Sequence, residues 1–141
     1  MQEHGDFQIF REGTHLLVSR MSGMYNEQGA KAYVRKIKAT IEEFQGQDYV
    51  MLLDFQGTEG ATPEAFHEMS AYIEWQNQLG NMIAKAYILG PKSMLTQQML
   101  KQWAPHSSYD QIGYYSTEDE ARQWLEEQFI NKTQGLKAPT P

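Results

Sequence analysis

The stretch that decides the fold is YVMLLDFQGTEGATP, which occupies residues 49–63 of a chain of 141 residues. Its first seven residues are almost all apolar, as in a strand that is covered on both faces of a sheet. Gly57 and Gly60 then predict a loop, because glycine adopts positive φ at little cost. Thr62 and Pro63 predict the N-cap and the first residue of a helix. A buried strand, a loop and a helix start are together typical of an α/β domain.

Hydrophobic periodicity predicts the other elements. Apolar residues at 7–9 and 16–21 flank a glycine-containing turn and predict an opening β-hairpin. Apolar residues three and four apart predict a helix from Asn26 to Phe44, which Gly46 ends. The elements predicted after the central stretch are a helix broken at Gly80-Asn81, a strand at 82–89, a helix at Ser93–Trp103, a strand at 111–115 and a helix that begins in the capping box Thr117-Glu118-Asp119-Glu120.

The predicted order is thus β-β-α-β-α-β-α-β-α. It predicts an α/β sandwich with a mixed sheet of about five strands and about four helices, with mainly parallel pairing in its later part. We expect residues 1–131 to form a single domain, because the chain has no internal repeat and no linker long enough to divide it. Residues 132–141 contain little apolar surface and are expected to form a flexible tail.

Composition excludes several classes of protein. The chain has no Cys, which excludes a disulfide scaffold and a thiolate zinc site, and its four His residues lack the spacing of a helical zinc site, so we expect no metal and no cofactor. A net charge of −6 argues against nucleic-acid binding. No apolar run approaches the roughly 18 to 20 residues that span a bilayer, and no signal peptide is recognisable, so we expect a cytoplasmic protein without membrane insertion.

The order of elements and the segment Leu53-Asp54-Phe55-Gln56-Gly57 resemble the STAS superfamily (sulfate transporter and anti-sigma factor antagonist), in which a central strand ends in a similar Asp-apolar-x-Gly. The chain looks most like the SpoIIAA-like branch. That branch commonly closes with an aromatic strand, acidic residues and an Ala-x-x-Trp-Leu helix, which residues 114–125 match. The resemblance covers residues 6–130, and it implies a SpoIIAA-like fold and a regulatory module.

One site departs from the family pattern. In the regulatory STAS proteins a phosphorylatable Ser, usually in Asp-Ser-Ser/Thr-Gly, opens the helix after the central strand. Here the corresponding place reads Gly60-Ala61-Thr62-Pro63-Glu64, and the Ser position falls on or near Pro63. Thr62 is the remaining phosphoacceptor candidate, since a helix N-terminus tolerates phosphate, but an N-cap role alone accounts for this residue. We therefore expect the usual serine phosphoswitch to be absent.

The leading hypothesis is a non-enzymatic regulatory or protein-binding module with an unknown protein partner, because the central loop exposes backbone and carries no catalytic motif. The expected contact residues are Asp54, Gln56, Gly57, Thr58, Glu59, Gly60 and Thr62. On this hypothesis, bulky residues at Gly57 and Gly60 should abolish partner capture and leave the thermal midpoint nearly unchanged. Asp54 is expected to organise the loop by accepting from the amides of Gly57 or Thr58, or else to serve an enzyme, the least favoured alternative.

Two further hypotheses come from other features of the sequence. The chain contains 8 Met and many aromatic residues, and flexible thioethers suit either an adaptable core or a cavity for a small apolar, lipid-like ligand. A carrier of such a ligand is thus the alternative to a protein-binding module. The edge strand of the opening hairpin could also pair with a copy of itself, which would give a homodimer.

Overall fold

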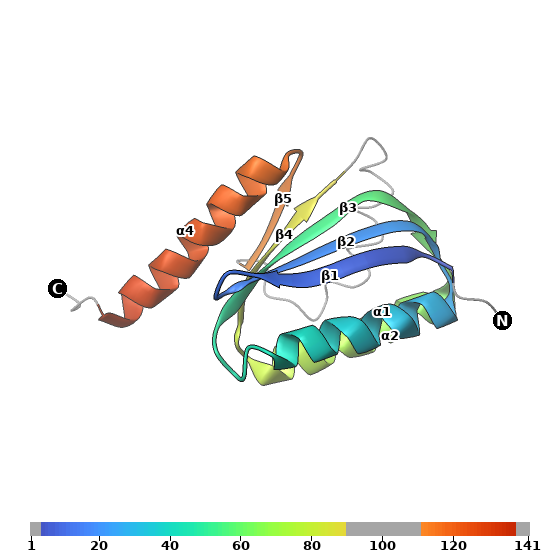
Figure 1. Ribbon diagram of the computed structural model, residues 1–141, viewed down its shortest axis with the longest axis horizontal. Coiled ribbons are helices and arrows are strands. Elements are labelled where there is room, and N and C mark those ends of the chain that lie inside the picture. The colour runs from blue at the N-terminus through green and yellow to red at the C-terminus, as the bar shows by residue number, and fades with distance from the viewer. Residues whose placement is uncertain (1–3, 90–110, 138–141) are drawn as a thin grey trace.

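The computed structural model describes residues 4–89 and 111–137, which build one five-stranded sheet with helices on both faces (Figure 1). The elements are β1 (Asp6–Glu12), β2 (Leu16–Tyr25), α1 (Glu27–Glu42), β3 (Tyr49–Ala61), α2 (Pro63–Leu79), β4 (Met82–Ile88), β5 (Ile112–Tyr115) and α4 (Glu118–Lys137). The sheet order is β1-β2-β3-β4-β5. β1 and β2 form the predicted antiparallel hairpin, and every other neighbouring pair is parallel.

The mixed five-stranded sheet is confirmed, while the order of elements differs from the predicted one. The described residues follow the order β-β-α-β-α-β-β-α and contain three helices rather than about four. The helix predicted at Ser93–Trp103 lies outside the described residues. The last helix also continues to Lys137, past residue 132, where the sequence predicts the start of the tail.

The largest correction concerns the predicted loop after residue 55. β3 continues through it to Ala61, because β2 runs alongside and supplies backbone partners for Gly57, Thr58 and Gly60. The register between the two strands shifts twice over this stretch. A Cβ atom at Gly57 would lie 2.8 Å from Cβ of Ser22, so this glycine permits two strands to approach closely rather than a chain reversal.

Each face of the sheet carries its own apolar cluster. On one face α1 and α2 pack over side chains such as Leu17, Met51 and Tyr87. On the other face α4 packs over a smaller cluster through Ala121 and Leu125. β3 contributes alternate residues to both clusters, which explains why its sequence is almost continuously apolar up to residue 55.

The predicted helix starts are confirmed by their hydrogen bonds. Gly29 N donates to Oδ1 of Asn26 at 2.8 Å, and Ala65 N donates to Oγ1 of Thr62 at 3.2 Å. In α4, Glu120 N donates to Oγ1 of Thr117 at 3.3 Å. None of the helices in the described part of the chain is long and apolar enough to cross a membrane.

Candidate functional site

Asp54 lies on the α4 face of the sheet, beside Arg20 in β2 and Ile88, the last residue of β4. Its Oδ2 accepts from Nη1 of Arg20 at 3.1 Å. Its Oδ1 accepts from the backbone N of Gln56 at 3.1 Å and from Nε2 of the same residue at 3.2 Å. Asp54 thus accepts from a nearby backbone amide, as predicted. The donor is Gln56 N, two residues ahead, and not the amide of Gly57 or Thr58.

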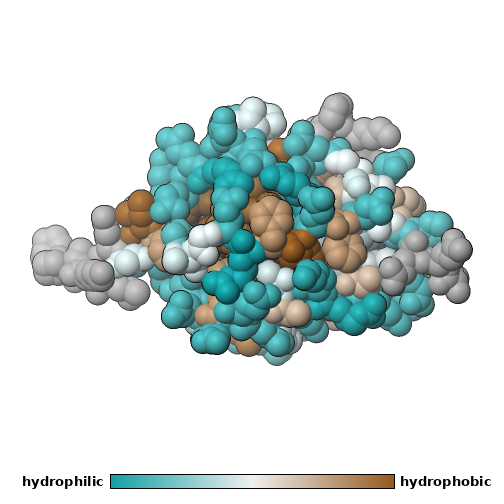
Figure 2. Space-filling view, in the orientation of Figure 1, coloured by the Kyte–Doolittle hydropathy of each residue, from teal (hydrophilic) through white to brown (hydrophobic). Residues whose placement is uncertain are grey.

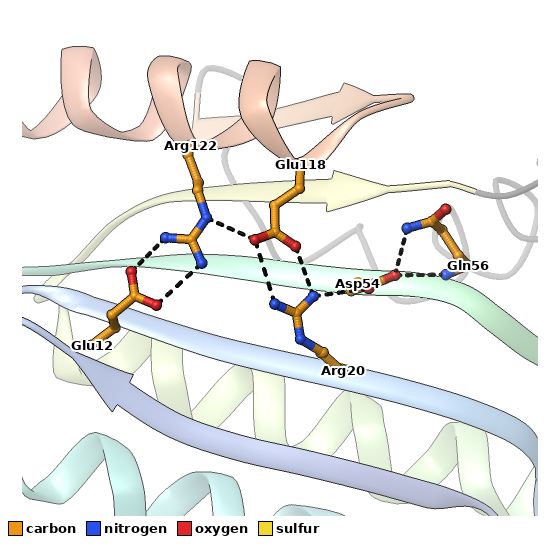
Figure 3. A network of polar contacts seen from close by, with 6 residues as sticks. All are labelled: Glu12, Arg20, Asp54, Gln56, Glu118 and Arg122. Carbon is orange, nitrogen blue, oxygen red and sulfur yellow. Dashed lines mark hydrogen bonds and ion pairs between the residues drawn. The ribbon is translucent and has the colours of Figure 1, made fainter.

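Arg20 also binds the first turn of α4, and this contact extends the site across the sheet (Figure 3). Its Nη1 donates to Oε1 of Glu118 at 2.8 Å, and Glu118 Oε2 accepts from Nε of Arg122 at 2.8 Å. Arg122 reaches on to Glu12 at the end of β1, with Nη2 donating to Oε1 at 3.2 Å. We call these five residues, with Asp54 included, the ion-pair network.

Mutual pairing shifts the acidity of the network's groups. The guanidinium of Arg20, followed by that of Arg122, lowers the pKa of Glu118 to about 2. The bond from Arg122 lowers the pKa of Glu12, and the same bond raises the pKa of Arg122. The network holds three carboxylates and two guanidinium groups, so it carries a net charge of −1 at neutral pH.

A further contact joins α4 to the turn between β1 and β2, one helical turn beyond Arg122. Glu126 Oε2 lies 2.9 Å from Nε2 of His15, whose ring stacks on Phe129 at a centroid distance of 3.7 Å. Residues 118, 122 and 126 are four apart and therefore share one face of the helix. Helix α4 is thus attached to β2, to β1 and to the turn between them by Glu118, Arg122 and Glu126, three side chains that alternate in charge.

The ion-pair network borders two grooves, one through Arg20 and Asp54 and the other through Glu12 and Arg122. The Asp54 groove has a volume of about 410 Å³ and is lined by Asp6, Phe7, Gln8, Arg20, Met21, Ser22, Asp54, Gln56 and Gly57. The second groove has a volume of about 600 Å³ and lies between the β1–β2 turn and α4, with His15 and Arg122 among its lining residues. In the described part of the chain, no three acidic or histidine side chains come close enough to hold a metal ion.

The expected contact residues lie along a strand and not in one exposed loop, while their role in partner binding stays a prediction. Asp54, Gln56 and Gly57 line the Asp54 groove on the α4 side. Thr58 is only 5% exposed, and its Oγ1 donates to the carbonyl of Met21 at 3.4 Å. Gly60 is also buried, whereas Glu59 is exposed. Strand alternation separates exposed Glu59 from buried Thr58 and Gly60, and the register shift between Asp54 and Gly57 leaves the neighbours Gln56 and Gly57 both exposed.

Thr62 is the N-cap of α2, and Pro63 is its first helical residue. The hydroxyl of Thr62 accepts the bond from Ala65 N, and the side chain is half-buried. The N-cap role is therefore confirmed. A role for Thr62 as phosphoacceptor stays a prediction.

The apolar, lipid-like ligand of the alternative hypothesis would have little room in the cavity between the helices and the sheet. The cavity there has a volume of about 10 Å³ and is lined by Met21, Tyr25, Ala30, Thr58, Gly60, Ala61, Ala65 and Met69. Such a volume holds about one water molecule. Met21, Met51, Met69 and Met82 are buried, so these four fill the core. This cavity is too small for a lipid-like molecule.

Sequence reasoning missed most of the ion-pair network. Arg20 interrupts an apolar strand, and the spacing of residues 118 and 122 is that of a helical ion pair, but neither signal identifies a partner 98 or 110 residues away. It also missed Lys85, which is 2% exposed in β4 with its Nζ 5.9 Å from the ring centroid of Tyr72. Burial lowers the pKa of Lys85 to about 7.

The chain matches a known protein family. The sequence profile of the SpoIIAA-like family matches residues 16–126. Comparison with curated proteins finds no match.

Three solved structures resemble the chain in fold. An uncharacterised protein with a SpoIIAA-like fold from Shewanella loihica is 13% identical, with a TM-score of 0.61 over 89% of this chain and 97% of that one. An anti-sigma factor antagonist from Mycobacterium paratuberculosis is 14% identical, with a TM-score of 0.60 over 86% and 94%. The phosphorylated Bacillus cell fate determinant SpoIIAA is 17% identical, with a TM-score of 0.59 over 85% and 99%.

Proposed function

Because the chain belongs to the SpoIIAA-like family, we propose that it is a non-enzymatic regulatory module that acts by binding another protein. Proteins of this fold include an anti-sigma factor antagonist. The proposed contact surface is the exposed part of the second half of β3 together with the start of α2, at Gln56, Gly57, Glu59 and Thr62.

The observation that supports this surface is the free side of β3. Pairing between β3 and β4 ends at Asp54 and Ile88, so from Gln56 to Ala61 β3 has β2 as its single strand neighbour in the described part of the chain. A strand with one unpaired side presents N–H and C=O groups that a partner can bind. Gln56, Gly57 and Glu59 are exposed along this segment.

The proposed module lacks the serine phosphoswitch. Pro63 occupies the first helical position and has no hydroxyl, and the Thr62 hydroxyl is engaged with Ala65 N. A phosphate on Thr62 would have to replace that bond. We therefore propose that partner binding depends on the shape and charge of the surface and not on phosphorylation at this helix start.

Site-specific photo-crosslinking tests the proposed surface. A photoreactive amino acid is placed at Gln56 or at Glu59 in the protein expressed in its own cells, and adducts are identified by mass spectrometry. We expect the same protein adduct from both positions. Glu42, an exposed residue on α1, is the matched control and should give none. Adducts of equal yield at all three positions, or a bound small molecule without any protein adduct, would contradict the proposal.

A further inference from the structure

β1 is an edge strand of the sheet. It pairs with β2 on one side, and among the described residues its other side has no strand neighbour (Figure 1). The strand has seven residues, Asp6–Glu12, which is long enough for regular pairing. An unpaired edge of this length offers a row of backbone donors and acceptors to another extended segment.

Two of the three charged residues of β1, Arg11 and Glu12, are held by contacts with other elements. The guanidinium carbon of Arg11 lies 4.6 Å from the ring centroid of Phe44, and its Nη1 donates to the carbonyl of Glu43 at 3.2 Å. Glu12 is held by Arg122 of α4. Charged side chains commonly shield an edge strand from association. Here Arg11 is held at the C-terminal end of α1 and Glu12 by α4 on the other face, which leaves Asp6 as the charged residue at the start of the strand.

Apolar side chains also gather over β1 (Figure 2). Phe10 is 39% exposed, although it is a large aromatic residue in a regular strand. Phe7 is half-buried, and its ring packs edge-on against Tyr33 of α1 at a centroid distance of 5.5 Å. An exposed aromatic beside an open strand edge gives a partner strand a side chain to pack on.

The alternation of β1 determines which side chains a neighbouring strand would meet. Phe10 pairs with Val18 of the α4-side cluster, so Asp6, Gln8, Phe10 and Glu12 project on the α4 face, and Phe7, Ile9 and Arg11 on the other. The carboxylate-bearing residues Asp6 and Asp54 line the same groove. Arg20, the cation of that groove, is already bound to Asp54 and Glu118. The α4 face of β1 therefore favours basic side chains.

We propose that the open edge of β1 is a second docking surface, which binds an extended, basic segment of a partner protein as a sixth strand, antiparallel to β1. The segment places basic side chains opposite Asp6 and Glu12, and apolar ones opposite Phe7 and Ile9. This pattern disfavours a second copy of the chain, because antiparallel pairing of two β1 strands over their full length sets Asp6 opposite Glu12 at both ends. The edge of β1 lies two strands away from β3, and the two proposed surfaces border the same groove, through Asp6 here and through Gln56 and Gly57 there.

The test uses a labelled, end-capped peptide, Lys-Glu-Val-Ile-Thr-Val-Lys, which complements residues 12 to 6 in antiparallel order. Binding is measured by fluorescence anisotropy at low salt. We expect saturable binding that is at least tenfold weaker for the charge-reversed peptide Glu-Lys-Val-Ile-Thr-Val-Glu. Binding should also be lost when Pro replaces the central Ile, because Pro removes a backbone donor without changing the charge.

Protein variants separate edge pairing from general attraction of cations. Asp6→Lys should weaken the basic peptide at least tenfold and strengthen the charge-reversed one, whereas Asp48→Lys, an exposed exchange of the same charge outside the sheet, should change neither. Equal binding of the Pro-containing peptide, or equal effects of both variants, would overturn the proposal. So would a dimer in native mass spectrometry that Asp6→Lys strengthens, because a second copy paired through Glu12 would then occupy the edge.

Discussion

Arg20 and Glu118 are 98 residues apart in sequence, yet Nη1 of Arg20 lies 2.8 Å from Oε1 of Glu118. This contact joins β2 to the first turn of α4 and gives the ion-pair network its centre, because each of the two residues has a second partner of opposite charge. Arg20 also lines the Asp54 groove, whose lining residues come from three neighbouring strands. The side chain that binds the first turn of α4 is therefore part of the groove.

Glu118→Gln should lower the free energy of unfolding at pH 7 by about 1 kcal/mol, since a side chain 34% exposed gains only modestly from ion pairs. The pKa of Glu118 is about 2 in the folded protein against an ordinary value of 4.5. The stabilisation is therefore complete above pH 4.5 and is lost as the pH falls toward 2. Urea unfolding at both ends of this range measures it, with Glu127→Gln on the same helix as control. An equal loss at pH 7 and at pH 2.5 would contradict the assignment.

Because Lys85 is buried, the free energy of unfolding should increase as the pH rises from 7 to 9. Its pKa is about 7 when folded against an ordinary 10.5, so in this range the unfolded chain binds more protons. The free energy of unfolding should rise by up to about 1.4 kcal/mol for each pH unit. Lys85→Met should remove the slope and raise stability at pH 7 in chemical denaturation. Identical pH profiles for the two proteins would show that Lys85 keeps an ordinary pKa.

Gly57→Ala should destabilise the fold by about 1 to 3 kcal/mol, the usual cost of overpacking. The new Cβ would lie 2.8 Å from Cβ of Ser22, so it would push β2 and β3 apart. This expectation replaces the one drawn from the sequence, in which Gly57 could be changed without loss of stability. Thermal unfolding measures the effect, and a second exchange, Ser22→Gly, should restore part of the loss. A midpoint unchanged in Gly57→Ala would contradict the close approach.

Thr62→Ala should cost about 1 kcal/mol of stability, because it removes the oxygen that accepts from Ala65 N at 3.2 Å. Thr62→Ser and Thr62→Asp keep an acceptor and should stay close to the original protein. Urea unfolding of the three variants separates capping from any other role. If serine and aspartate were as damaging as alanine, the hydroxyl bond would not be the source of the effect.

Most secondary structure of the described residues follows from local patterns. The hairpin turn, the caps at Asn26 and Thr62 and the break at Gly80 were all predictable, because each depends on residues within a few positions of one another. The continuation of β3 was not. Two glycines predict a loop when taken alone, and only the presence of β2 alongside makes them part of a strand.

The candidate site also has one part that local sequence predicts and another that depends on distant segments. Asp54 could be singled out from the sequence, because a carboxylate that follows an apolar run marks a point near the end of a buried strand. Its partner Arg20, and the link from Arg122 to Glu12 across 110 residues, could not. Hydrophobic periodicity shows which face of an element is buried, and it carries no information about which charged side chains meet across that face.

By itself, the sequence determined the α/β class, the family resemblance and the alternation that sends β3 side chains to both faces, since propensity, capping and periodicity are local properties of the chain. Tertiary structure alone decided that the glycine stretch is a strand, that Lys85 is buried and that Glu118, Arg122 and Glu126 of α4 bind β2, β1 and the turn between them. These features depend on contacts between segments distant in sequence, whose free energy arises only when the sheet brings them together.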